Sequence, residues 1–188
     1  MPSFPPRTGP RPAWYRRLSP SLRRVAARSD AHPAIALHPS ASLEAAVGEL
    51  AGALAAARPV AVEAVAQRIA DGVCRGLGVR PLRVRVEARR PRDQRGELHG
   101  LYEPGRPGRA DVITLWMLTA QRGQVVAYRT FLRTLLHELC HHLDYELLGL
   151  PASLHTQGFY QRESSLFGAL GADRVDAPTR HPVASGPA

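Results

Sequence analysis

The sequence predicts an α+β fold, and three stretches of the chain carry that prediction. Apolar residues recur at helical spacing over residues 62–77 and again over residues 128–147, which is typical of amphipathic helices. Between them, residues 82–87 alternate apolar with charged side chains, as in a strand with one buried face. Helices on both sides of such strands fit one layered domain around a small sheet.

Composition divides the chain into a globular region and two flanking segments. The 188 residues are 44% hydrophobic, enough for one buried core. We expect the folded domain to span residues 41–170. Residues 1–40 hold eight prolines, seven arginines and one acid, which is typical of a disordered basic arm. Residues 171–188 are rich in Pro, Ala and Gly and are expected to form a disordered tail.

The basic arm has two interpretations. It can tether nucleic acid electrostatically, with Trp14 and Tyr15 available to stack on bases. It can equally be a solvated tail. All 25 basic residues of this chain, whose net charge is +9, are arginine, a bias that nucleotide composition can produce without any phosphate to contact. The charge alone therefore leaves nucleic acid as an open partner.

Two helices are expected before the first strand. Residues 42–57 are rich in alanine, and Ser42 is a candidate N-cap. Pro59 suits the first turn of a second helix that runs to about Leu77, and Gly78 marks its end. The apolar spacing predicts helices that serve packing.

Two further strands are expected after residues 82–87. They span residues 98–103 and 111–118 and are joined by a turn at residues 104–108, which contains two prolines and two glycines. Together the three strands predict a small mixed sheet. His99 stands alone on a strand, which favours a surface or packing role over metal binding.

The segment from His137 to His141 has the pattern H-E-x-x-H. With a rise of about 1.5 Å per residue, its two histidines lie one turn apart on one helical face and can bind one ion. Zinc suits such ligands, and Glu138, about 100° round the helix, is placed to take a proton from a water at the metal. A polar stripe holds both histidines opposite the apolar stripe, which favours a metal site. His142 lies on the flank and is not expected to bind the ion.

A catalytic zinc takes three protein ligands and keeps one position for water, so one more ligand is needed. Asp144 lies about 10 Å along the axis from His137, which predicts an acceptor for a ligand imidazole. His155 follows a helix stop at which the chain can fold back over the ligand face. Glu163 belongs to a predicted helix over residues 156–170, where apolar neighbours would bury its carboxylate unless a metal, histidine or arginine meets it. The residues favour His155 and leave Glu163 open.

The stretches TLLHELCHHL and HTQGFYQR resemble the SprT-like (Spartan-like) zinc metallopeptidases, in which H-E-x-x-H is followed by a third histidine in an H-G-x-x-F segment. The resemblance implies a zincin-like domain with His155 as the third ligand and Glu138 as the catalytic base. Phe159 keeps the aromatic position of that family, whereas Thr156 stands where the family has glycine.

The same resemblance implies a sheet edge beside the metal cleft, to which a peptide can add by backbone hydrogen bonds. Residues 111–118 are the candidate for this edge, although a core strand is equally compatible with their sequence.

The predicted activity is zinc-dependent hydrolysis of peptide bonds in a protein or peptide substrate, and Tyr160 is considered as an additional oxyanion donor. The alternative is a zinc-stabilised binding protein without hydrolysis, such as a nucleic-acid adaptor. A closed structural zinc site needs four protein ligands, and the sequence offers three good ones, which favours catalysis.

The sequence shows no membrane-spanning run and no secretory signal, so we expect no membrane partner and a cytoplasmic location. Two cysteines, Cys74 and Cys140, are too few for a disulfide framework and are expected to pack as small apolar residues.

Overall fold

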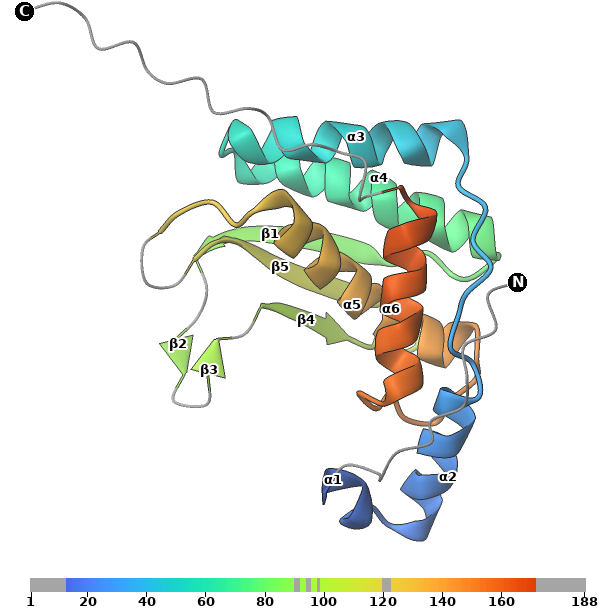
Figure 1. The fold of residues 1–188 in the computed structure, drawn as a ribbon. Helices are drawn as coiled ribbons and strands as arrows, with labels where there is room; N and C mark the ends of the chain where they lie inside the picture. Colours follow the sequence, from blue (N-terminus) through green and yellow to red (C-terminus); the bar gives the residue numbers. More distant parts are fainter. Residues whose placement is uncertain (1–12, 90–91, 94–95, 98, 120–122, 172–188) are drawn as a thin grey trace, which may run out of the picture.

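The computed structural model describes residues 13–89, 92–93, 96–97, 99–119 and 123–171. In these ranges the chain forms both helices and strands, which agrees with the predicted α+β class (Figure 1). The helices are α1 (Ala13–Arg16), α2 (Pro20–Asp30), α3 (Ala41–Ala55), α4 (Pro59–Leu77), α5 (Tyr128–Glu146) and α6 (Gln157–Ala169). The strands are β1 (Arg83–Arg89), β2 (Arg92–Asp93), β3 (Gly96–Glu97), β4 (Gly100–Glu103) and β5 (Val112–Leu118).

The main sheet is small and mixed, as predicted. Its strand order is β1-β5-β4, with β1 parallel to β5 and β4 antiparallel to it. Strands β2 and β3 form a separate antiparallel pair. Of the two possibilities for residues 111–118, the sheet edge is wrong and the core strand is confirmed, because β5 pairs on both sides. Five consecutive buried residues, from Ile113 to Met117, give β5 the apolar content of a central strand.

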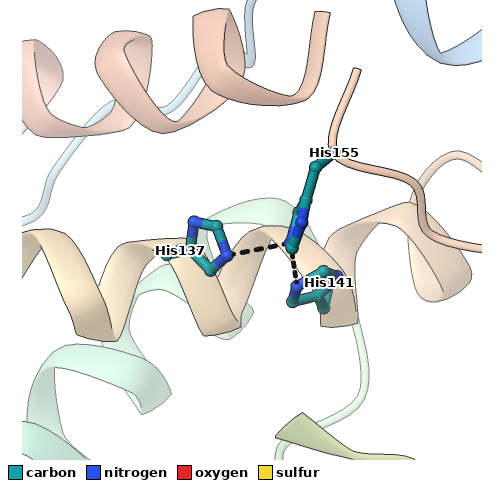
Figure 2. A group of neighbouring side chains, drawn as sticks. All are labelled: His137, His141 and His155. Atoms are coloured by element: carbon teal, nitrogen blue, oxygen red, sulfur yellow. Dashed lines mark hydrogen bonds between the residues drawn. The ribbon is translucent and has the colours of Figure 1, made fainter. Parts of the chain in front are cut away.

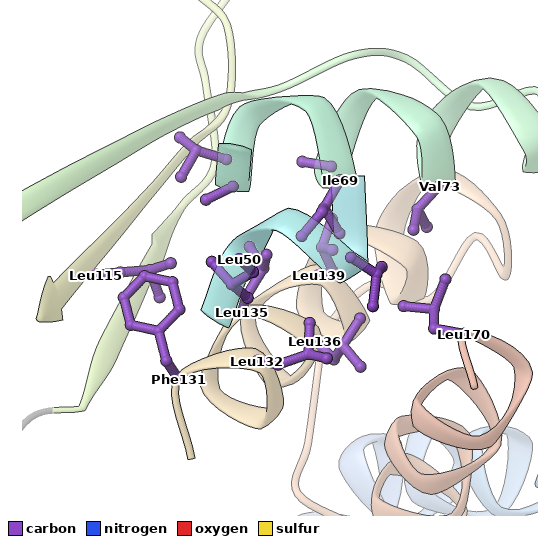
Figure 3. Packing of buried hydrophobic residues seen from close by; sticks show 14 of the residues in the cluster. Leu50, Ile69, Val73, Leu115, Phe131, Leu132, Leu135, Leu136, Leu139 and Leu170 are labelled. Atoms are coloured by element: carbon purple, nitrogen blue, oxygen red, sulfur yellow. The ribbon is translucent and has the colours of Figure 1, made fainter. Parts of the chain in front are cut away.

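The core lies between one face of this sheet and the helices α3, α4 and α5 (Figures 1 and 3). Leu50 of α3, Ile69 of α4 and Leu139 of α5 meet Leu115 of β5 in one buried cluster. Helices α3 and α4 therefore serve packing, as expected. Helix α3 begins at Ala41, one residue earlier than predicted, and its N-cap is Ser40, whose hydroxyl accepts a hydrogen bond from Leu43 N, in place of Ser42.

The outer edge of β1 is closed by side chains of α4. The Gln67 amide accepts a hydrogen bond from Val84 N (2.8 Å) and donates one to Leu82 O (2.9 Å). The Glu63 carboxylate accepts another from Val86 N (2.8 Å). These bonds satisfy backbone groups that an edge strand would otherwise present to a further strand.

The segment expected to be a disordered arm is ordered over residues 13–40, and the prediction is corrected there. Ser19 caps α2, and Val25, Ala26 and Ser29 are buried on its inner face. Ile35 and Leu37, in the segment that follows, join the core. Prolines and arginines dominated the composition, but this face is apolar enough to pack. Residues 1–12 lie outside the described ranges, and so do residues 172–188 of the expected tail.

Helix α2 docks on α6 through a buried arginine. Arg162, wholly buried, donates to the carbonyl oxygens of Ser29 (2.7 Å) and His32 (2.6 Å) and to the Ser29 hydroxyl (2.9 Å). It also pairs with the buried carboxylate of Asp144 on α5 (2.7 Å). One guanidinium thus holds three helices together, because its fork of donors can reach acceptors on each.

None of the helices in the described ranges combines the length and apolarity needed to cross a bilayer.

The docking of α2 predicts opposite effects for two glycines of α6. A Cβ on Gly158 would clash with the carbonyl oxygen of Ser29 and lie 2.7 Å from the Cα of Asp30, whereas one on Gly168 meets no atom within 4 Å. Gly158→Ala is expected to lower the free energy of unfolding by about 1–3 kcal/mol. Gly168→Ala should be neutral or stabilise by up to about 1 kcal/mol, since alanine favours a helix over glycine. Urea unfolding measures both, and equal effects would mean that α2 does not dock.

Candidate metal centre

Helix α5 positions the H-E-x-x-H motif because its two faces meet different surroundings. Phe131, Leu132, Leu135 and Leu139 are buried in the core, as their spacing predicted. Leu147 departs from that prediction, since it follows the end of the helix and is 39% exposed. The opposite face carries the two histidines of the motif, which are half-buried at the floor of a cleft.

The chain then turns back over this face. Leu150 N donates to Asp144 O (2.8 Å), and Gly149 takes a φ of +57°, a conformation that glycine adopts without strain. Helix α6 begins after Thr156, whose hydroxyl accepts from Phe159 N (3.2 Å). The turn between the two helices brings His155 opposite the motif, as predicted.

The three predicted ligands lie together (Figure 2). His155 Nε2 lies 3.0 Å from His137 Nε2 and 3.0 Å from His141 Nε2. The ligand atoms of this cluster all fall within 4.8 Å of one another, so the three imidazoles could hold one metal ion. Two zinc–nitrogen bonds of about 2.1 Å at a tetrahedral angle would separate their nitrogens by about 3.4 Å, which is close to these spacings.

The remaining ring nitrogens of the two helical histidines face side chains that orient them. His137 Nδ1 lies 3.2 Å from Glu163 Oε2, and the other oxygen of this carboxylate meets Arg133. His141 Nδ1 lies 2.7 Å from the Ser153 hydroxyl. Glu163 therefore meets both a histidine and an arginine on the side of His137 remote from the cluster. This placement favours an orienting role for Glu163 over the ligand role that the sequence left open.

Asp144 contacts a ligand imidazole only through Ser153, and not directly as predicted. Its carboxylate accepts from the Ser153 hydroxyl (2.7 Å), and that oxygen in turn faces His141, so the carboxylate does not meet an imidazole directly. Burial raises the pKa of Asp144, while hydrogen bonds from Ser153 and Arg162 oppose that shift. The series of hydrogen bonds Arg162–Asp144–Ser153–His141 connects the contact between α2 and Arg162 to the histidine cluster.

Phe159 supports all three rings from α6. Its ring centroid lies 4.9 Å from that of His137, 4.7 Å from that of His141 and 5.0 Å from that of His155. The aromatic side chain is wholly buried, so it fixes the rings by packing.

Burial disfavours protonation of two of these imidazoles. Burial first, and then the neighbouring rings of His155 and His137, lower the pKa of His141 to about 3. The pKa of His155 is also lowered, by burial first and then by His137. Neutral imidazoles can bind a metal without first losing a proton.

Glu138 is buried between α5 and β4. Only 6% of the residue is exposed, and burial raises the pKa of its carboxyl to about 7, although His137 and the backbone of Tyr102 oppose the shift. The strand approaches closely because residue 100 is glycine: a Cβ there would lie 2.7 Å from Glu138 Oε1 and 2.9 Å from Thr134 Cγ2. The carboxyl can exchange a proton near neutral pH.

A cleft of about 890 Å³ opens over this cluster. Its walls come from β4, from α5 and from the turn that carries Ser153 and His155. The strand beside the cleft is thus β4, in place of residues 111–118. His99, exposed at the start of β4, also lines the cleft but does not belong to the histidine cluster.

Sequence reasoning missed the roles of several side chains near the site. His142 lies outside the histidine cluster and is fully buried, with Nδ1 2.9 Å from Asp111 Oδ2 and Nε2 2.8 Å from Arg80 O. Tyr102 stacks on His141 at 6.3 Å between centroids and donates to Asp111 (3.0 Å). The helical position of His142, one residue from the polar stripe, gave no signal of its distant partners.

Tyr160 and the cysteines complete the comparison with the sequence. Tyr160 is 49% exposed, with its ring 5.9 Å from that of His155, but it is not among the residues that line the cleft. Its oxyanion role stays a prediction. Cys74 and Cys140 are free and buried, as expected.

No family model, curated protein or solved structure matches this chain.

The first prediction for this site separates ligand from orienting residue. His155→Ala removes one of three nitrogens and is expected to abolish stoichiometric zinc binding. Glu163→Gln keeps an oxygen near His137 Nδ1 and should weaken zinc binding by about 10- to 100-fold, the range for such neighbours of a ligand. Competition with a chromophoric chelator measures both affinities. If His155→Ala retained zinc and Glu163→Gln lost it, Glu163 would be the ligand and His155 the orienting residue.

The second prediction concerns pH. Because the folded state lowers the pKa of His141, the unfolded chain takes up a proton as pH falls below about 6.5, and the folded chain does not until near pH 3. This contribution to stability is present above pH 6.5 and is lost as pH falls.

In metal-free protein, the free energy of unfolding of the wild type should therefore fall more than that of His141→Gln when the pH is lowered from 7.5 to 5. Urea unfolding at each pH tests this, with the exposed His38→Gln as the control. Parallel pH curves for wild type and His141→Gln would contradict it.

Proposed function

We propose that this chain is a zinc-dependent metallopeptidase with a zincin-like domain, as the resemblance to SprT-like enzymes implies. One observation carries the proposal: three imidazole Nε2 atoms converge beside a buried carboxyl, Glu138, at the floor of an open cleft. Ligands for a Lewis acid and a candidate proton acceptor are thus together at a surface that a substrate can reach.

Zinc fits the donor set. Three imidazoles, with orienting partners on His137 and His141, are typical of catalytic zinc, which keeps its fourth position for water or substrate. Within the described residues the cluster contains no fourth side chain, and both cysteines lie apart from it, so the set does not form a closed structural site.

The chemistry divides between the ion and the chain. Zinc, when bound, supplies a Lewis acid that polarises a carbonyl and acidifies a water. Glu138 takes a proton from the attacking water and returns it to the leaving amine, and a pKa of about 7 suits both steps. The buried contact with β4 fixes its carboxyl. Burial of its surroundings also strengthens its interaction with charge that develops in the cleft.

A peptide substrate suits the shape of the cleft. Strand β4 pairs with β5 on one side, and its other edge, among the described residues, carries no strand. Because Gly100 and Tyr102 both line the cleft, an extended chain added along β4 would pass over the histidines. The backbone of β4 would then supply affinity without reading the substrate sequence.

The alternative from another class is a zinc-stabilised protein that binds without hydrolysis. The orientation of Glu138 toward the cleft favours catalysis, because a purely structural ion has no use for a buried proton acceptor beside an open position.

Glu138→Gln separates these two functions. The amide keeps the shape of the side chain but cannot act as a base, so cleavage of casein or of a quenched peptide library should fall by about 10²- to 10⁴-fold. Zinc content should stay near one ion per chain. Wild-type rates in the glutamine variant would refute the mechanism.

A matched control is Glu44→Gln, on the first turn of α3 and outside the residues that line the cleft, which should keep full activity. If zinc binds tightly to both the wild type and Glu138→Gln while neither hydrolyses any library, the binding-protein alternative is favoured.

A further inference from the structure

A second cavity, of about 480 Å³, lies where the turn before β5 faces the start of β1, and it shares no lining residue with the metal cleft. Its walls are three arginines, two glycines and a proline: Arg80, Gly105, Arg106, Pro107, Gly108 and Arg109. No part of the proposed hydrolysis uses these residues.

Two of the arginines stand at the two ends of one tight turn. Arg109 N donates to Arg106 O (2.8 Å), with Pro107 and Gly108 between them and a φ of +83° at Gly108, as in a type II turn. Gly105 packs against this turn so closely that a Cβ would clash with the carbonyl oxygen of Arg109. The turn therefore has a defined shape that keeps both arginine backbones close together.

Both walls of the cavity are hydrogen-bonded to the buried pair His142 and Asp111. His142 Nε2 donates to Arg80 O (2.8 Å) on one wall, and His142 Nδ1 lies 2.9 Å from Asp111 Oδ2. Asp111 Oδ1 accepts from Gly105 N (2.6 Å) on the other wall. The spacing of the walls is thus set by buried hydrogen bonds, which makes this cavity more than a chance gathering of surface side chains.

The cavity has more cations than its surroundings neutralise. Arg80 is paired with Glu146 through two bonds of 2.7 and 2.6 Å. Arg106 and Arg109 are exposed, and neither forms an ion pair with a carboxylate of the described residues. The carboxylate of Asp111 lies behind the turn, where His142 faces it. Two guanidinium groups are therefore available to an anion.

We propose that this cavity binds a phosphate group. Guanidinium forks match the oxygens of phosphate in pairs, and two uncompensated positive charges suit a dianion. The volume leaves room for a group attached to the phosphate, as in a nucleotide. This proposal does not depend on the proposed hydrolysis, because the two cavities are lined by different residues.

The test is a calorimetric titration of the zinc-loaded full chain with inorganic phosphate, at constant low ionic strength. Arg106→Gln and Arg109→Gln should each weaken saturable phosphate binding by about tenfold or more, the usual effect of losing a charged hydrogen-bond donor. Arg85→Gln, an exposed arginine of β1, is the matched control and should bind as wild type does. Zinc content should be equal in all four proteins, which separates this cavity from phosphate held at the metal.

A parallel titration with a short oligothymidylate distinguishes the source of the phosphate. Oligonucleotide binding that weakens in both turn variants, and that inorganic phosphate displaces, identifies a phosphate within a nucleic-acid chain. Phosphate binding without oligonucleotide binding identifies a free phosphate or a small phosphate ester. The proposal is overturned if wild type binds neither probe saturably, or if Arg85→Gln loses as much affinity as the turn variants, since binding would then follow overall charge.

Discussion

The buried ion pair between Arg162 and Asp144 is the interaction on which the rest of the site depends. Both side chains are fully buried, so neither charge could remain there without the other. Asp144 in turn accepts from Ser153, which faces His141 on the opposite side. The pair therefore joins α6 to α5, and through Ser153 it orients the ring of His141.

This arrangement explains why a segment distant in sequence matters at the histidine cluster. Ser29 and His32 contribute carbonyl oxygens to Arg162, and Ser29 also bonds to Thr156, the N-cap of α6. The residue before that cap is His155. The position of the third imidazole thus depends on α2, although no residue of α2 lines the cleft. Such support at a distance is common for metal ligands, whose geometry is set largely by their neighbours.

The local patterns were good predictors, and the long-range contacts were not. H-E-x-x-H, the apolar stripe of α5 and the alternation at residues 82–87 each depend on a period that one element determines by itself, and apart from Leu147 they were found where expected. The sequence left open whether β5 is an edge or a central strand, because strand order depends on partners far along the chain.

Composition misled at the N-terminus for a related reason. Pro and Arg dominate residues 1–40, yet α2 docks through three buried positions of its own, a glycine of α6 and the buried Arg162. Ser153 gave no signal at all: a serine in a loop acquires its role only when an imidazole and a carboxylate reach it from different turns of a helix. The helix stop before His155 favoured this residue as the third ligand, and the geometry brings that histidine to the other two.

The closing of β1 by Gln67 and Glu63 has a consequence for self-association. An open strand edge is a template on which identical chains can stack, and a three-stranded sheet normally has two such edges. Here α4 occupies one of them, so sheet-to-sheet polymerisation cannot continue in both directions from a single molecule. At most two copies could join through β4, and that pairing would cover the histidines. The same edge cannot serve assembly and the peptide substrate proposed above at one time.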